Sequence, residues 1–226
     1  KRDSARLKVG NAFEQMIATA ASGSDNQLQF VKSFTAFASS AEHNDLLKDF
    51  LAGKLSGLKV DPEMRWSLVI ALTERGLMDE EQLAAELKLD QTLTGKLSYQ
   101  TALAARPIQS AKQQVWDEIT SGDLSTSQRE AKVAGFVRPL HRPLLASYVD
   151  PYFDLLLDTW GKKSYEVASK FVSGLYPIYL TTQETLDKTN AWLNGAGKDG
   201  QAGLRRLVIE AKDSLERALA VQKQDK

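Results

Sequence analysis

The chain has no cysteine, only two histidines and only six prolines among its 226 residues. Without cysteine it has no disulfide framework, no thiolate metal site and no catalytic thiol. The absence of cysteine does not identify a compartment, and we expect a cytoplasmic protein. The chain does not begin with methionine, so we expect it to be a piece of a longer protein.

The chain also has no excess of positive or of negative charge. Lysine plus arginine and aspartate plus glutamate both number 29, so the formal net charge is zero. A nucleic-acid-binding protein normally shows a basic excess, and we therefore expect no nucleic-acid partner. No apolar run approaches the roughly 18–20 residues of a membrane span, and no basic-then-apolar leader is present. We expect no membrane partner.

The two histidines, His43 and His141, stand 98 positions apart and neither belongs to a His-Glu-x-x-His motif. A zinc site made from them is not expected, so we predict no catalytic residue, no metal ligand and no cofactor in this segment. No Gly-x-Ser-x-Gly motif occurs either. A Ser/His/Asp set stays open, because its members meet in space and not in sequence.

The residues that are abundant favour helix. Ala, Leu, Glu, Gln and Lys dominate, and alternation with a period of two is nowhere sustained. Residues 61–119 read as four consecutive helices. Asp61 and Asp79 are suited to cap helix starts, and Gly76 is suited to a left-handed helix end.

The remaining segments extend this pattern. We expect a short helix from residue 44 or 45 to residue 55, and an apolar helix over residues 144–160 that kinks or breaks at Pro151. Four glycines make residues 194–203 the most mobile-looking loop, and residues 222–226 are expected to fray.

These segments predict an all-α protein of about eleven helices. Short loops between helices of this length suit an α-solenoid of stacked antiparallel pairs. A compact helical bundle is the alternative. We expect one helical domain, residues 1–226.

The order and spacing of one set of residues resemble a known family. The set is Asp61, Arg65, Trp66, Arg75, Gly76, Thr94, Gly95, Ala104, Ala105, Arg106, Pro107, Ala111, Lys112, Val115 and Trp116. Segments 135–136, 144–149, 152–153, 171–177 and 204–208 continue it. Over roughly residues 25–222 the chain resembles the C-terminal helical domain of the aminopeptidase N family of zinc peptidases, in its bacterial, actinobacterial-like branch.

This resemblance implies a fold and a function. It implies HEAT- or armadillo-like helix pairs with degenerate repeats, wound into a curved superhelix. It also implies a non-catalytic domain that caps the active-site chamber of a parent enzyme and limits peptide access. The parent would be a zinc metallo-aminopeptidase, with its catalytic domain and peptide substrates as the partners of this segment. The segment alone is predicted to be inactive.

Four residues are candidates for contact with a peptide in that chamber: Arg65, Arg138, His141 and Arg142. The alternative for Arg65 is a salt bridge to a carboxylate, with Trp66 packed between helices. Arg138, His141 and Arg142 form a cationic turn that could attract a peptide carboxylate. The alternative for this turn is an exposed loop with ordinary surface charges.

Two other function classes stay open at this point. One is a stand-alone α-solenoid adaptor that binds a protein or peptide on its concave face. A His-Glu-x-x-His motif upstream of Lys1 would exclude it. The other is an independent helical enzyme, which would need a pocket with a cluster of perturbed polar groups.

Overall fold

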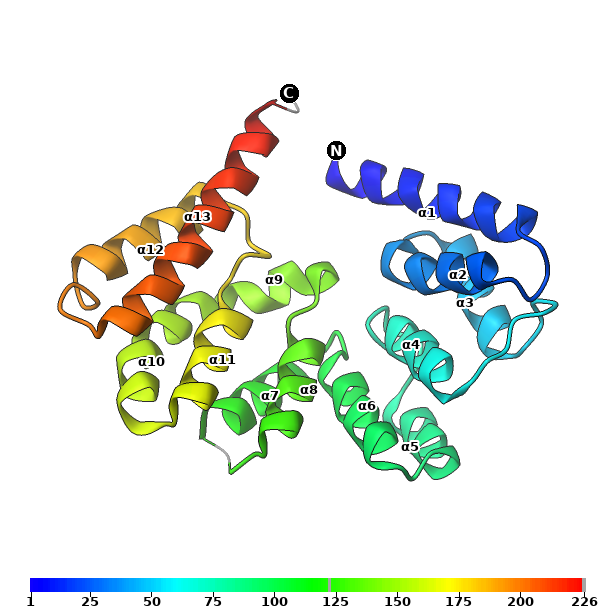
Figure 1. Ribbon diagram of the computed structural model, residues 1–226, viewed down its shortest axis with the longest axis horizontal. Coiled ribbons are helices and arrows are strands. Elements are labelled where there is room, and N and C mark those ends of the chain that lie inside the picture. The colour runs from blue at the N-terminus through cyan, green and yellow to red at the C-terminus, as the bar shows by residue number, and fades with distance from the viewer. Residues whose placement is uncertain (122, 225–226) are drawn as a thin grey trace. The chain divides into compact units, whose positions relative to one another are not determined.

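The computed structural model describes residues 1–121 and 123–224. These residues form thirteen α-helices and two short 3-10 helices, with no β-strand among them (Figure 1). The all-α prediction is therefore confirmed. Within the described residues, no helix is both long enough and apolar enough to span a bilayer.

The chain divides into two compact units, Lys1–Pro107 and Ile108–Lys226. The prediction of one domain over residues 1–226 stays a prediction, as does the curved superhelix of HEAT- or armadillo-like repeats. Residues 225 and 226 of the expected frayed tail lie outside the described residues, whereas residues 222–224 continue the last helix.

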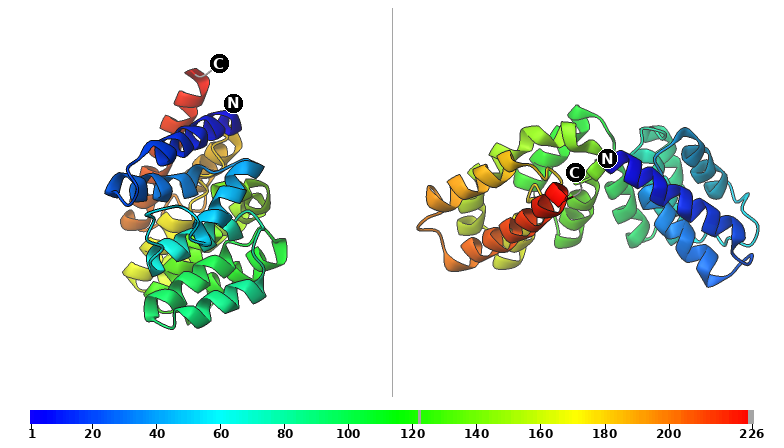
Figure 2. Two further views of the ribbon diagram at one scale, coloured as in Figure 1. Left: turned by 90° about the vertical axis from the view of Figure 1, so that its right-hand side faces the viewer. Right: turned by 90° about the horizontal axis from the view of Figure 1, so that it is seen from above.

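The first unit contains six helices. They are α1 (Arg2–Thr19), α2 (Asp25–Phe37), α3 (Ala41–Leu51), α4 (Pro62–Thr73), α5 (Glu80–Leu89) and α6 (Leu93–Ala104). Helix α1 packs along α2, α3 packs on α4, and α5 packs on α6, while α4 contacts both α2 and α6 (Figure 2). The unit thus consists of successive helix pairs, with α2, α4 and α6 as neighbours in one row.

Local sequence signals set the helix boundaries in this unit. The Asp61 carboxylate accepts the backbone N–H of Met64 at 2.9 Å, and Asp79 forms a reciprocal capping box with Gln82. Gly76 takes a φ of +72°, which side chains with a β-carbon disfavour. These three expectations are confirmed. The predicted start of α3 at residue 44 or 45 is wrong. The Ser40 side chain caps this helix, which begins at Ala41.

The second unit contains the remaining elements. They are α7 (Gln109–Ser121), α8 (Thr126–Phe136), η1 (Pro139–His141), α9 (Arg142–Leu145), η2 (Ala146–Tyr148), α10 (Val149–Lys162), α11 (Tyr165–Leu175), α12 (Gln183–Asn194) and α13 (Ala202–Gln224). Helix α13 packs against α11 and α12, and α11 also contacts α8 and α10.

Aromatic side chains form much of the second unit's core. The rings of Trp116 and Tyr148 lie 5.1 Å apart, and Tyr152 stacks on Phe171 at 6.0 Å. Tyr148, Tyr152 and Phe153 are all buried. Trp160, also on α10, is only half-buried.

Pro151 does not kink a helix. The break occurs earlier, at the 3-10 turn η2, and α10 then begins at Val149, so that Pro151 occupies its first turn. The first four N–H groups of a helix have no partner within it, and proline therefore costs no hydrogen bond there. The single helix predicted over residues 144–160 is therefore wrong: the range contains the end of α9, η2 and most of α10.

The glycine-rich segment between α12 and α13 is closed by local bonds. The N–H of Gly197 donates to the Trp192 carbonyl at 2.8 Å, and the Arg205 guanidinium donates to the carbonyls of Leu193 and Gly197. A β-carbon on Gly197 would come within 2.4 Å of the Trp192 ring. Glycine at this position therefore permits close packing against an indole.

Candidate functional site

Arg65 forms a bidentate salt bridge that joins α4 to α5. Its Nε lies 2.5 Å from one carboxylate oxygen of Glu86, and its Nη2 lies 2.7 Å from the other. This planar fork is the strongest geometry for an arginine–carboxylate pair. Pairing with a carboxylate was one of the two predicted roles of Arg65 and is observed, whereas contact with a peptide stays a prediction.

Trp66 is buried between helices, as its alternative role predicted. Its side chain is 5% exposed and packs in a small apolar cluster with Val69, Leu83 and Ala102. Its indole N–H donates to Oδ2 of Asp90 at 2.9 Å. The ring therefore ties α4 to the connection between α5 and α6.

Asp90 is the polar centre of that connection. Its Oδ1 accepts the hydroxyl of Thr92 at 2.6 Å and the Thr92 backbone N–H at 3.2 Å. The hydrogen bonds from Thr92, and then the one from Trp66, lower the pKa of the Asp90 carboxyl below its usual value. The group is therefore charged at neutral pH.

Gly95 is required by the approach of Asp90 to the start of α6. A β-carbon at Gly95 would lie 2.4 Å from both the carboxyl carbon and the backbone oxygen of Asp90. Because one of these atoms is backbone, the chain would have to move. The resemblance included Gly95, and this contact gives a physical reason for glycine there.

We expect Gly95→Ala to lower the free energy of unfolding by about 1–3 kcal/mol, since the added methyl group overpacks the Asp90 connection. Gly161→Ala in α10 is the matched control, because nothing lies within 4 Å of its β-carbon position. That change should be neutral or stabilising by up to about 1 kcal/mol. Urea denaturation of both variants measures the difference, and equal effects at the two glycines would contradict this packing.

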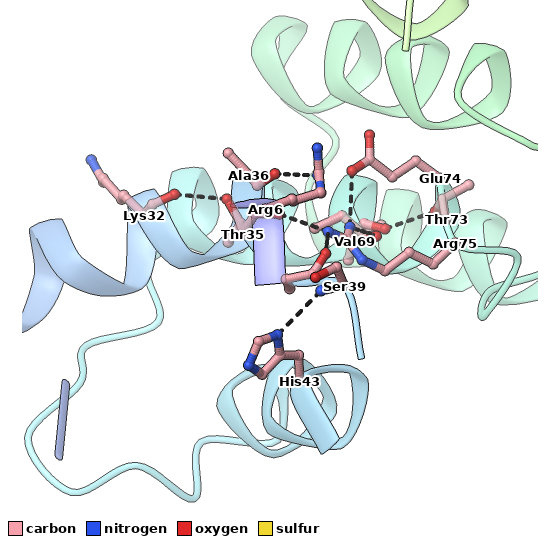
Figure 3. Close-up of polar contacts among 12 residues, drawn as sticks. Arg6, Lys32, Thr35, Ala36, Ser39, His43, Val69, Thr73, Glu74 and Arg75 are labelled. Carbon is pink, nitrogen blue, oxygen red and sulfur yellow. Dashed lines mark hydrogen bonds and ion pairs between the residues drawn. The ribbon is translucent and has the colours of Figure 1, made fainter. Parts of the chain in front are cut away.

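Buried charge in the first unit gathers at the C-terminal end of α2 (Figure 3). The Arg75 side chain is 6% exposed and its guanidinium donates to the carbonyls of Thr35 and Ala38, at 3.1 and 2.6 Å. It also donates to the carbonyl of Ala71 and, at 2.9 Å, to the carboxylate of Glu74. Arg75 thus satisfies carbonyls at the ends of two helices.

Arg6 completes this end of α2 from the side of α1. Its guanidinium donates to the Ala36 carbonyl (Figure 3). Burial lowers the pKa of Arg6, while the charges of Glu74 and Asp3 raise it. Arg6 of α1 and Arg75 of the turn after α4 therefore both donate to carbonyls at the end of α2.

His43, on α3, is a buried structural histidine. Its ring is 1% exposed and its Nδ1 accepts the Ser39 N–H at 3.2 Å (Figure 3). Its Nε2 lies 3.4 Å from Glu14. Because an N–H donates to Nδ1, the proton of the neutral ring lies on Nε2. Gly10 allows this packing, since a β-carbon there would meet the ring at 2.6 Å.

The predicted cationic turn occupies η1 and the start of α9 in the second unit. The Arg138 carbonyl accepts the His141 backbone N–H at 2.9 Å, and Arg142 Nε donates to the Pro139 carbonyl at 2.9 Å. Arg138 and Arg142 are partly exposed, but His141 is buried. The exposed-loop alternative is therefore wrong for His141, and the role of the turn in peptide contact stays a prediction.

No group of three or more histidine, cysteine, aspartate or glutamate side chains is arranged to hold a metal ion in residues 1–121 and 123–224. The two histidines lie in different units, and both are buried.

Comparison with known proteins then identifies the family. The sequence model of the ERAP1-like C-terminal domain matches residues 3–217. The chain belongs to the ERAP1-like C-terminal domain family. A curated relative, aminopeptidase N from Streptomyces lividans, is 41% identical over 212 residues, which is 92% of this chain and 24% of the relative. The predicted resemblance to the C-terminal domain of aminopeptidase N enzymes is confirmed, and the chain spans about a quarter of that relative's length.

Several residues that carried the family resemblance have structural roles. Lys112 is fully buried, and its ammonium donates to the carbonyls of Gly135 and Phe136 at 3.2 and 3.1 Å. It therefore caps the end of α8 from α7. Gly95 and Arg75 have the packing and capping roles described above.

Sequence reasoning missed Asp90 and Glu86 as partners of Trp66 and Arg65. These pairs are 24 and 21 positions apart, and no short-range pattern marks them. To find these two partners, one would have to know that α4 packs against α5 and the connection that follows it.

Proposed function

We propose that this chain is the non-catalytic C-terminal domain of an aminopeptidase N-like zinc exopeptidase. It would close the active-site chamber over the catalytic domain and limit access to peptides. The parent enzyme would remove N-terminal residues by zinc-assisted hydrolysis of the first peptide bond. Its partners would be that catalytic domain and peptide substrates, and we propose a cytoplasmic location.

The observation that carries this proposal is the extent of the family match. The match covers residues 3–217, while the aminopeptidase N relative is about four times as long as the segment it shares with this chain. This sequence contains no His-Glu-x-x-His motif, so zinc and the catalytic groups would belong to the rest of the parent. The same match favours this proposal over a stand-alone adaptor.

The experiment that tests the absence of catalysis uses the purified 226-residue chain. We expect no hydrolysis of leucyl- or alanyl-arylamides and no stoichiometric zinc in the same sample. Adding the metal-containing domain in trans provides the positive control for the assay. Turnover by the chain alone together with one bound zinc would overturn the proposal.

The cationic turn gives a second test, in the parent enzyme. Replacing Arg138 and Arg142 together with alanine should leave zinc content and hydrolysis of a leucyl-arylamide unchanged. It should raise KM for longer peptides at least tenfold, since loss of even one charge-assisted hydrogen bond costs about 1.5 kcal/mol or more. Equal kinetics for short and long substrates would count against this turn as a substrate contact. Lysine at both positions is the matched control, because it keeps the charge.

A further inference from the structure

A cavity of about 370 Å³ lies between α4 and α6 in the first unit. Helix α4 supplies one face of it, including Trp66 and Ile70, which are four residues apart and therefore on the same side of the helix. Ser98 of α6 and Asp90 of the preceding connection also line it, and Asp90 lies next to Trp66, whose indole N–H it accepts. Its volume falls in the roughly 300–1,000 Å³ range of small-ligand sites.

The wall of this cavity combines apolar surface with one fixed charge. Asp90 accepts three hydrogen bonds, from Trp66 and twice from Thr92, whereas a carboxylate offers about four acceptor positions. The lowered pKa of the Asp90 carboxyl keeps the group ionised. The described hydrogen bonds thus fill three of these positions, and Asp90 lines the same cavity as an indole and an isoleucine.

The second acid at the cavity differs from Asp90. Glu63 is mostly exposed and is already paired with Lys32 of α2 at 2.8 Å. Its charge is therefore compensated within the unit. The described contacts of Asp90 include hydrogen-bond donors but no cation.

This combination selects the chemistry of an occupant. An anionic group would meet the Asp90 charge, and a purely apolar group would remove water from that carboxylate without replacing its hydrogen bonds. A group with an apolar stem and a cationic end satisfies both parts of the wall, because lysine and arginine bury their stems on apolar surfaces while the charged end stays polar.

We propose that this cavity binds the side chain of a lysine or arginine residue in a peptide substrate. The aliphatic stem lies along Trp66 and Ile70, and the cation binds Asp90. Assignment of the occupant to a substrate rests on the proposed chamber role, whereas binding of the side chain itself does not.

The test uses the 226-residue chain and two peptides, acetyl-Ala-Lys-Ala-amide and its counterpart with norleucine in place of lysine. The chain has four tryptophans, so a nitrogen–proton spectrum resolves four indole resonances, and Trp66→Phe assigns the one of interest. The lysine peptide should shift the Trp66 resonance saturably. The norleucine peptide should bind about tenfold more weakly, because it lacks the charged donor.

Three variants localise the binding. Asp90→Asn should weaken the lysine peptide by about tenfold and remove its preference over norleucine. Glu63→Gln, which changes an acid already paired with Lys32, should alter the affinity by less than about twofold. Ser98→Phe should abolish binding of both peptides by filling the cavity. Because this variant keeps Asp90, it tests the site even if Asp90→Asn folds poorly.

Equal affinity for the two peptides would overturn the proposal, and so would unchanged binding to Ser98→Phe. The readout involves no catalysis, so failure of the chamber role cannot produce either result. In the parent enzyme, peptides with lysine at an inner position should show a lower KM than their norleucine counterparts, and Asp90→Asn should remove that difference. Peptide binding by the chain with no such KM difference would overturn the assignment to a substrate.

Discussion

Replacing Trp66 with alanine is expected to lower the free energy of unfolding by about 3–5 kcal/mol. The indole is 5% exposed, so its removal leaves a cavity against Leu83 and Ala102. It also removes the N–H that the Asp90 carboxylate accepts at 2.9 Å. Both effects act in the first unit, and urea denaturation followed by circular dichroism measures them.

Trp160→Ala is the matched control for this variant. Trp160 is half-buried and its indole N–H bonds Gln201 near the surface. We expect a smaller loss there, about 1–2 kcal/mol. An unchanged melting temperature for Trp66→Ala would reject its placement in the core.

The second large effect is expected for Arg75→Ala, which should lower the free energy of unfolding by about 3–5 kcal/mol. The change removes a 6% exposed guanidinium from the carbonyls of Thr35 and Ala38 and from the carboxylate of Glu74. In the variant, these oxygen atoms lose the hydrogen bonds that the Arg75 guanidinium donates to them. Thermal unfolding and urea titration both report the loss.

Arg75→Lys separates charge from geometry. Lysine keeps the positive charge but replaces a planar fork by a single ammonium, so it cannot reach the carbonyls of both α2 and α4 in the same way. We expect a loss of about 1–3 kcal/mol, between wild type and Arg75→Ala. A lysine variant as stable as the wild type would show that charge alone holds this end of α2.

Much of the fold could be predicted because its signals are local. Asp61, Asp79 and Gly76 act on the backbone within a few residues of themselves, and their roles follow from residue type and position. Pro151 shows the limit of the same reasoning. Proline disrupts the interior of a helix but not its first turn, and its effect therefore depended on where α10 begins.

The polar partners could not be predicted in the same way. A packed Trp66 and an Arg65 salt bridge were one of the two alternatives for these residues, but the choice of Glu86 and Asp90 as partners depends on how α4, α5 and α6 pack. The cationic turn shows the same dependence. Its residues were identified from charge, whereas the burial of His141 follows from packing in the second unit.

The most direct test of the central claim compares the parent enzyme with a form that lacks this 226-residue segment. Zinc content, leucyl-arylamide hydrolysis and cleavage at the N-terminus of a folded protein are measured for both. A capping domain predicts stoichiometric zinc and arylamide turnover without the segment, together with a rise in cleavage of the folded protein that falls again when the chain is added back. Loss of zinc on deletion, or the same ratio of folded-protein to arylamide cleavage in both forms, would contradict the account.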